Sequence, residues 1–379
     1  MYLRLAGCFL ALGLILTACG GGESATTDAA GTSVPAERQS IEGIAALAMV
    51  DESHSGQLDD FCRNVYGDAA LNTEMTVGLV AHVASIDDGT FNQAAFEGME
   101  AASRCFGVTT TFLDSASDDA AAQIASFADR DLDVIITVGF QFQDATLEAV
   151  EARPDLRFIG VDQANPDRVP NYVAISFDDG QVGFLAGATA ALMTESGTVG
   201  IVAGPDSVPP VVAIADGFEA GVRQVSPDVT VLREHLDSFA DAPAGARQAS
   251  DFVKEGADVI FGAAGETGSG AILAGANAGA RVIGVDQDEY FTTFAGGAEP
   301  NADRLVSSAM KRVDLGVFLT LAAMTTGEVE GGDLVLNATN GGVTYAPFHS
   351  ADVPASVAST LERLRIDLAA GKLETVLPE

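Results

Sequence analysis

Basic residues are scarce in this chain. The 379 residues include 19 Lys and Arg against 54 Asp and Glu, which gives a formal net charge of −35. A surface of this sign repels phosphate backbones, so we do not expect nucleic acid as a partner. The charge does not argue against a neutral ligand in an enclosed pocket. After its first residues the chain also lacks a run of about 18 apolar residues, so no later segment is expected to cross a membrane.

Patterns of catalysis and metal binding are missing as well. The four His residues follow no metal-ligand spacing, and no Gly-x-Ser-x-Gly elbow occurs. The glycines of residues 262–270 resemble a phosphate-binding loop, but they lack the Lys-Ser/Thr pair of a P-loop. We therefore expect no enzyme activity, no metal and no cofactor.

The first residues have the features of a bacterial lipoprotein signal, residues 1–18. Arg4 precedes the apolar stretch Leu5–Leu16, which continues into Thr17-Ala18-Cys19 and three Gly. This lipobox pattern predicts cleavage before Cys19 and lipidation of its thiol, and an ordinary secretory signal is the alternative. Residues 19–74 are expected to comprise the lipidated Cys, a flexible tether rich in small residues and an N-terminal extension. The expected location is the extracytoplasmic face of the cell membrane.

Two further cysteines, Cys62 and Cys105, stand outside the signal and the lipobox. An exported chain meets an oxidising environment, in which the two can form a disulfide. This bond would join the segment before the first strand to the end of the first helix. Two separate buried thiols are the alternative.

Residues 77–163 and 199–287 are two copies of one pattern. Each copy opens with Val-Gly-Leu/Ile-Val-Ala and closes with Ile-Gly-Val-Asp-Gln. A period this long is too large for a solenoid repeat, so the repeated unit is a whole lobe. Two related lobes in one chain leave a cleft between them, and small molecules bind in such clefts.

Strand and helix patterns alternate within each copy. Continuous apolar strands separated by helices predict parallel sheets that are covered on both faces, which is an α/β fold. After the second copy we expect a helix at Leu305–Thr326, a short strand near Leu334–Leu336 and a final helix at Ser356–Ala370. The expected N-terminal lobe comprises residues 75–178 and 288–325, and the C-terminal lobe comprises residues 179–287 and 326–379. Several chain crossings would then form a hinge that closes around a ligand.

Ser85–Gln93 reads Ser-Ile-Asp-Asp-Gly-Thr-Phe-Asn-Gln, which resembles the Asp-Asp-Lys-Ser-Phe-Asn-Gln signature of the basic membrane protein family. Further matching segments are Gly139–Ala145, Phe184–Gly187, Gly217–Val222, Gly262–Gly268, Gly284–Asp286, Lys311–Asp314 and Gly341–Val343. The family consists of lipoprotein substrate-binding components of ABC importers, similar to the purine nucleoside receptor A group. The resemblance implies a type I periplasmic-binding-protein fold, with two doubly wound parallel-sheet lobes joined by a multi-stranded hinge. It also implies a monomer that works with an ABC permease and an ATPase.

The resemblance further implies which residues bind the ligand. Phe91, in the first turn of its helix, matches the aromatic that stacks on a nucleobase, and a core position is its alternative. Asn92 and Asp144 match polar positions that contact the base or the ribose, although Asp144 can instead be a helix N-cap. Asp286 matches the acceptor for two ribose hydroxyls. Its twin in the first copy, Asp162, is expected to be structural.

Two more matches and two departures complete the expected site. Gly265 is expected to offer backbone contact to the sugar, and Lys311, one of three Lys in the chain, is expected in the site. His82 stands where the family has an acidic residue that reads the purine edge, and a neutral His lacks paired acceptors. Ile214 stands where the family has the second stacking aromatic. A diol site is therefore expected to be retained and base recognition to be altered.

These observations predict an extracytoplasmic binding lipoprotein of an ABC importer, with a nucleoside as the small-molecule ligand. A binder of a different small metabolite and a ligand sensor that signals to a membrane receptor are the alternatives. A purely structural surface lipoprotein is a third possibility, against which Asp286 and Lys311 argue.

Overall fold

The computed structural model describes residues 57–66, 73–81, 85–113, 119–327, 329 and 331–376. The lipobox with Cys19 and the departure at His82 lie outside the described residues. Every described residue belongs to one compact unit.

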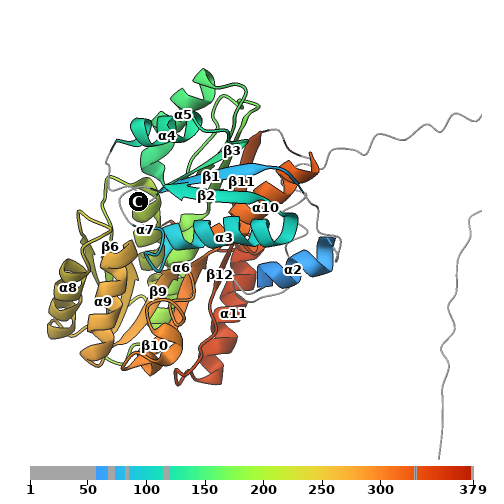
Figure 1. Ribbon diagram of the computed structural model, residues 1–379. Helices are drawn as coiled ribbons and strands as arrows, with labels where there is room; N and C mark the ends of the chain where they lie inside the picture. The colour runs from blue at the N-terminus through green and yellow to red at the C-terminus, as the bar shows by residue number, and fades with distance from the viewer. Residues whose placement is uncertain are drawn as a thin grey trace, which may run out of the picture. The chain divides into compact units, whose positions relative to one another are not determined.

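The first lobe is built on a six-stranded sheet in the order β11-β5-β4-β3-β1-β2, with all neighbouring strands parallel (Figure 1). Its strands are β1 (Thr76–Ala81), β2 (Thr109–Leu113), β3 (Val134–Val138), β4 (Arg157–Val161), β5 (Tyr172–Phe177) and β11 (Gly332–Leu336). The associated helices are α3 (Phe91–Phe106), α4 (Ala120–Ala128), α5 (Gln143–Ala152), α10 (Val313–Thr326) and the short 3-10 helix η1 (Phe140–Phe142).

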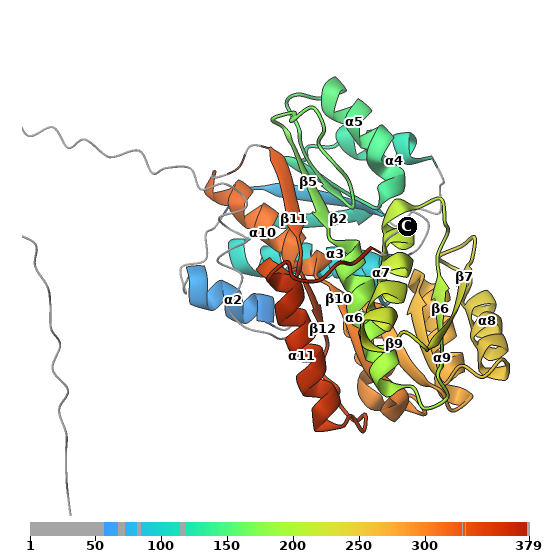
Figure 2. The same cartoon turned by 180° about the vertical axis from the view of Figure 1, so that it is seen from behind.

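The second lobe has a six-stranded sheet in the order β12-β10-β9-β8-β6-β7, in which only β12 runs antiparallel to its neighbour (Figure 2). Its strands are β6 (Thr198–Ala203), β7 (Thr230–His235), β8 (Val259–Ala263), β9 (Arg281–Asp286), β10 (Leu305–Lys311) and β12 (Val343–Tyr345). The associated helices are α6 (Asp179–Met193), α7 (Pro209–Val225), α8 (Ala242–Lys254), α9 (Gly265–Asn277) and α11 (Ala355–Ala369), with 3-10 turns η2 (Ala295–Gly297), η3 (Ala302–Arg304) and η4 (Ala338–Asn340).

Both sheets are covered on both faces, as continuous apolar strands require. In β3, Val134, Ile135 and Ile136 are all fully buried. Val134 and Ile136 belong to the core that contains α3 and α10, whereas Ile135 belongs to the core under α4 and α5. Alternate residues of one strand therefore fill two cores, and the predicted α/β architecture is confirmed.

The sheet orders reproduce the duplication seen in the sequence. Strands β1 to β5 occupy the same places in the first sheet as β6 to β10 in the second, and β11 and β12 are equivalent edges. The helix after the fifth strand of each lobe crosses to the other lobe. Thus α6 follows β5 but packs against α7, and α10 follows β10 but packs against α3. The α3–α10 contact is close, since a Cβ on Gly98 would lie 2.3 Å from the Asp314 carbonyl oxygen.

The expected helix at Leu305–Thr326 is wrong in its first half. Residues 305–311 form β10, every residue of which is buried, and the helix begins only at Val313. The expected lobe boundaries also differ from the strand order, because β10 belongs to the second sheet and β11 to the first. We propose instead that the chain crosses between the lobes near Asp178, Arg312 and Asn337.

The N-terminal extension is fixed to the first lobe through α2 (Gln57–Tyr66). A disulfide joins Cys62 of α2 to Cys105 of α3, with 5.9 Å between the two Cα atoms. The Phe61 ring packs edge-on against Phe318 of α10. Within the part of the chain that the structure describes, no helix is long and apolar enough to cross a membrane.

Candidate ligand-binding cleft

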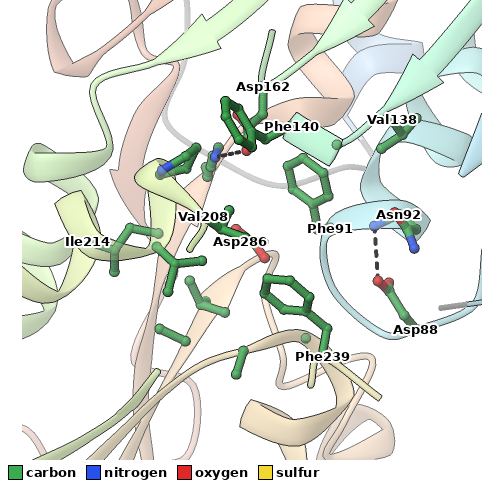
Figure 3. A pocket seen from close by; sticks show the side chains of 18 of the residues that line it. Asp88, Phe91, Asn92, Val138, Phe140, Asp162, Val208, Ile214, Phe239 and Asp286 are labelled. Atoms are coloured by element: carbon green, nitrogen blue, oxygen red, sulfur yellow. Dashed lines mark hydrogen bonds and ion pairs between the residues drawn. The ribbon is translucent and has the colours of Figure 1, made fainter. Parts of the chain in front are cut away.

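A cavity of about 700 Å³, partly open to solvent, lies between the lobes (Figure 3). Its walls come from the carboxyl ends of the parallel strands, the usual place for ligands in open α/β sheets. The lining residues are Asp88, Phe91, Asn92, Val138, Gly139, Phe140, Gln141 and Asp162 from the first lobe, and Val208, Pro210, Val211, Ile214, Phe239, Ala263, Ala264, Gly265, Val285, Asp286 and Lys311 from the second.

The cavity brings together most of the residues singled out from the sequence, which are Phe91, Asn92, Ile214, Gly265, Asp286 and Lys311. Asp144 is not among its lining residues. It is exposed in the first turn of α5, and the helix has no side-chain cap at its N-cap residue Phe142.

Phe91 is held in place by the turn that precedes it. The carboxylate of Asp88 accepts hydrogen bonds from the backbone N–H groups of Thr90 (2.9 Å), Asn92 (3.1 Å) and Gln93 (3.1 Å). These are donors that the first turn of a helix cannot satisfy internally. Burial raises the pKa of Asp88, while the three backbone donors lower it. The half-buried Phe91 side chain packs against the lobe core and also lines the cavity.

Lys311 joins the two lobes at the inner end of the cavity. Its ammonium donates to Oδ2 of Asp162 in the first lobe at 2.6 Å and lies 2.8 Å from Oδ1 of Asp179 in the second. The ammonium also lies 5.1 Å from the ring centre of Phe91 and 4.8 Å from that of Phe177. Burial alone would lower the pKa of Lys311, but the nearby carboxylates raise it above its ordinary value. The side chain is therefore charged, although only 2 % of it is exposed.

Asp286 is a buried acid that makes no hydrogen bond or ion pair within the described part of the chain. It is 8 % exposed, and its carboxylate accepts no hydrogen bond from the described residues. Burial raises the pKa of Asp286 to about 8, even though Lys311 acts in the opposite direction. A buried polar group without a partner costs free energy, which a ligand with hydroxyl donors would offset. Its backbone has φ of 65°, a left-handed conformation that is uncommon outside glycine.

Asp162 repeats this arrangement in the first lobe. It also has a left-handed backbone, with φ of 57°, and it also lines the cavity. Its Oδ2 binds Lys311, whereas its buried Oδ1 accepts no hydrogen bond from the described residues. We expected Asp162 to be structural, and its ion pair with Lys311 is consistent with such a role, but Asp162 also lines the cavity. The pattern Ile-Gly-Val-Asp-Gln thus supplies one cavity carboxylate from each lobe.

Two aromatic residues of the cavity were not singled out from the sequence, Phe140 and Phe239. Phe239 belongs to the loop between β7 and α8, and a Cβ on Gly204 would lie only 2.5 Å from its ring. Phe140 follows β3 and is 36 % exposed. Figure 3 shows both rings and that of Phe91 at the cavity walls. Their signal in the sequence was their position just beyond the carboxyl end of a parallel strand.

The chain is similar to known binding proteins along most of its length. The model of the family described as ABC transporter substrate-binding protein PnrA-like matches residues 75–363. A CD4+ T-cell-stimulating antigen from Listeria innocua is 32% identical over 286 residues, which cover 70% of this chain and 78% of that protein. An ABC transporter nucleoside-binding protein, BmpA, from Lactococcus lactis is 28% identical over 288 residues, covering 72% of this chain and 82% of that protein.

A solved structure with the same fold is that of an ABC transporter solute-binding protein from Aeropyrum pernix K1. It has a TM-score of 0.71 at 22% identity and covers 80% of this chain and 94% of that one. This likeness confirms the expected periplasmic-binding-protein fold. The family match assigns this chain a small-molecule ligand, an ABC permease as partner and a membrane-associated, extracytoplasmic location. The chain belongs to the PnrA-like family of ABC transporter substrate-binding proteins, whose members include the basic membrane proteins.

Proposed function

We propose that the ligand captured between the two lobes is a nucleoside. The observation that carries this proposal is the combination, in one cavity, of two features. The buried Asp286 carboxylate accepts no hydrogen bond from the described residues, and aromatic rings from both lobes line the same cavity. A ribose offers two neighbouring hydroxyl donors, and a nucleobase offers a flat face. The name of the Lactococcus lactis relative, a nucleoside-binding protein, supports the same ligand class.

The ribose is proposed to lie at the end of the cavity that contains Asp286, Lys311 and Asp162. Two adjacent hydroxyls can donate to the two oxygens of an ionised Asp286. The free Oδ1 of Asp162 is a further acceptor for a sugar hydroxyl. Gly265, at the first position of α9 with φ of 56°, offers backbone to the cavity wall beside Phe239.

The base is proposed to stack between Phe91 of the first lobe and Phe239 of the second. Ile214 lines the same cavity but has no flat face, so Phe239 is the second-lobe residue suited to stacking. Stacking on an aromatic side chain contributes about 1–3 kcal/mol per base. The remaining wall is mainly apolar, with Val138, Val208 and Val211. Asn92, in the first turn of α3, is a polar residue that also lines the cavity.

The finer points of location and assembly are also proposals. The lipobox supports attachment through a lipid on Cys19, and the complete cavity within one chain supports a monomer. The absence of nucleophile and metal-ligand patterns from the sequence supports a binding role without catalysis.

A thermal-shift screen tests the ligand class. A ligand that binds only the folded state raises the melting temperature according to its concentration and affinity. The screen would include ribonucleosides, 2′-deoxynucleosides, free bases, pentoses and amino acids. We expect ribonucleosides to give the largest shifts. Larger shifts from another class, with none from nucleosides, would reject the proposal.

A further inference from the structure

Besides the Lys311–Asp162 pair, two side-chain hydrogen bonds between described residues cross the cleft beside the cavity. Nε2 of Gln287 donates to the Thr90 carbonyl oxygen at 2.7 Å, and Oγ1 of Thr292 donates to the Gly89 carbonyl oxygen at 2.8 Å. Both acceptors immediately precede Phe91 in the first lobe. Gln287 immediately follows Asp286 in the second lobe. The bonds therefore connect the backbone segments that carry the proposed stacking and ribose-binding residues.

Each segment is anchored within its own lobe. In the second lobe the fully buried Glu289 accepts hydrogen bonds from the Val285 N–H at 3.0 Å and from Ser269 at 2.8 Å. Its own N–H donates to Oγ of Ser308 at 3.0 Å. In the first lobe the Asp88 carboxylate fixes the turn. The two crossing bonds thus join segments that are each fixed within their own lobe. Because neither segment can follow the other lobe, the bonds must break when the lobes separate.

The duplication shows that the residue equivalent to Gln287 makes no such crossing bond in the first copy. Gln163 is the counterpart of Gln287, yet among the described residues its side chain bonds only within the first lobe. It donates to the Gly139 carbonyl oxygen at 3.1 Å and accepts from the Tyr172 hydroxyl at 2.9 Å. Thr293, the neighbour of Thr292, likewise bonds to Glu289 within its own lobe. Gln163 and Thr293 therefore serve as controls for Gln287 and Thr292, because their side chains are the same but bond within one lobe.

We propose that Gln287 and Thr292 are positioning residues that hold the lobes closed and set the rate at which bound ligand leaves. Their bonds exist only in the closed arrangement, so they oppose opening. Binding to the open lobes does not need them, so the association rate is unaffected. The inference about ligand release rests on the proposed nucleoside site, whereas the inference about closure does not.

The first test measures the release of a bound ribonucleoside by stopped-flow displacement. The variants are Thr292→Val and Gln287→Met, which keep side-chain size, with Thr293→Val as the matched control. Each crossing bond is expected to slow release about five-fold, so each variant should release ligand about five-fold faster with an unchanged association rate. Thr293→Val should release ligand at the parent rate. Parent-like release from both crossing variants, or an equal gain in Thr293→Val, would overturn the proposal.

The second test needs no nucleoside. Small-angle X-ray scattering of the ligand-free proteins should give a larger radius of gyration for the Thr292→Val/Gln287→Met double variant than for the parent and for Thr293→Val. Thermal melting shows whether each variant folds. If the parent binds no nucleoside, the proposed ligand fails, and scattering still decides on the crossing bonds. Identical scattering from the folded double variant and the parent would overturn the proposal that the crossing bonds hold the lobes closed.

Discussion

Replacement of Asp286 by Asn isolates the chemistry of the proposed ribose site. Asn has nearly the same shape and tolerates the left-handed backbone at this position, so the fold should be retained. It replaces a carboxylate with an amide that has one acceptor oxygen. Hydrogen bonds to charged groups contribute about 1.5–3 kcal/mol each. Loss of one such bond should weaken binding of a ribonucleoside by about ten-fold or more.

The raised pKa of Asp286 adds a pH dependence to this prediction. With a pKa of about 8, the carboxyl group is mainly protonated in the unbound cleft at neutral pH. A protonated acid cannot accept from both ribose hydroxyls, so binding should require ionisation. Affinity for a ribonucleoside should rise up to ten-fold per pH unit below about 8 and level off above it. The Asn variant should lack this dependence.

The raised pKa of Asp286 also affects stability, and here the sign is opposite: ligand affinity rises with pH, whereas the free energy of unfolding falls. The folded state holds the proton of Asp286 up to about pH 8, whereas the ordinary pKa is 3.8. Between these values the folded state binds more protons than the unfolded state, so the free energy of unfolding falls as pH rises. Asp286→Asn removes this contribution. The variant should therefore melt at a higher temperature than the parent at pH 8, although it binds ligand less well.

Calorimetric titration at pH 6 to 9 with a ribonucleoside and its 2′,3′-dideoxy analogue would measure these effects. The parent should prefer the ribonucleoside, and Asp286→Asn should lose that preference while binding the dideoxy analogue as the parent does. If the variant bound both compounds with parental affinity at every pH, the reasoning about the ribose site would be refuted.

Three further predictions concern the base, the anchor and the disulfide. Phe239→Ala should weaken nucleoside binding by about ten-fold or more, and Ile214→Phe in that background should restore part of it if a flat face is what was lost; unchanged calorimetric affinity would exclude stacking on Phe239. Cys19→Ser should move the protein from the membrane fraction to the soluble exported fraction, and continued detergent-dependent extraction would argue against a lipid anchor. Cys62→Ser with Cys105→Ser should lower the free energy of unfolding by about 2–4 kcal/mol, because the bond closes a loop with a sequence separation of 43; full alkylation of both thiols in unreduced, denatured parent would show that they are not bonded.

The lobe architecture was predictable because its signals are local. Most of the strands, namely β1, β3, β4, β5, β6, β8 and β9, are short and largely buried apolar runs, and the repeat of these runs revealed the two lobes. Strand β10 was not predictable in this way. Leu305–Lys311 is buried on both faces, and no Gly or Pro separates it from the apolar helix that begins at Val313. Periodicity cannot separate a buried strand from a buried helix. The proposed chain crossing at Arg312 depends on which sheet β10 joins. That pairing is decided by contacts with strands that are distant in the sequence.

The candidate site could also be predicted only in part from the sequence. Phe91, Asp286 and Lys311 were found because a family pattern and the strand ends both pointed to them. Phe239 could not be predicted from the family pattern, which places the second aromatic at Ile214 on α7. Phe239 instead lies on the loop between β7 and α8, and its place in the cavity depends on the tertiary fold. Asp162 could have been found from the duplication alone. Its equivalence to Asp286 predicts the same place at a strand end, and the pairing with Lys311 explains how a second buried carboxylate is tolerated.

The claim that the cleft binds a whole nucleoside is tested most directly by calorimetric titration of the parent protein with a ribonucleoside, its free base and D-ribose. Stacking on the aromatic rings and hydrogen bonding to Asp286 should act together, so the nucleoside should bind at least about ten-fold more tightly than either fragment. Equal or tighter binding of ribose or of the free base, or no binding of any nucleoside, would contradict the account.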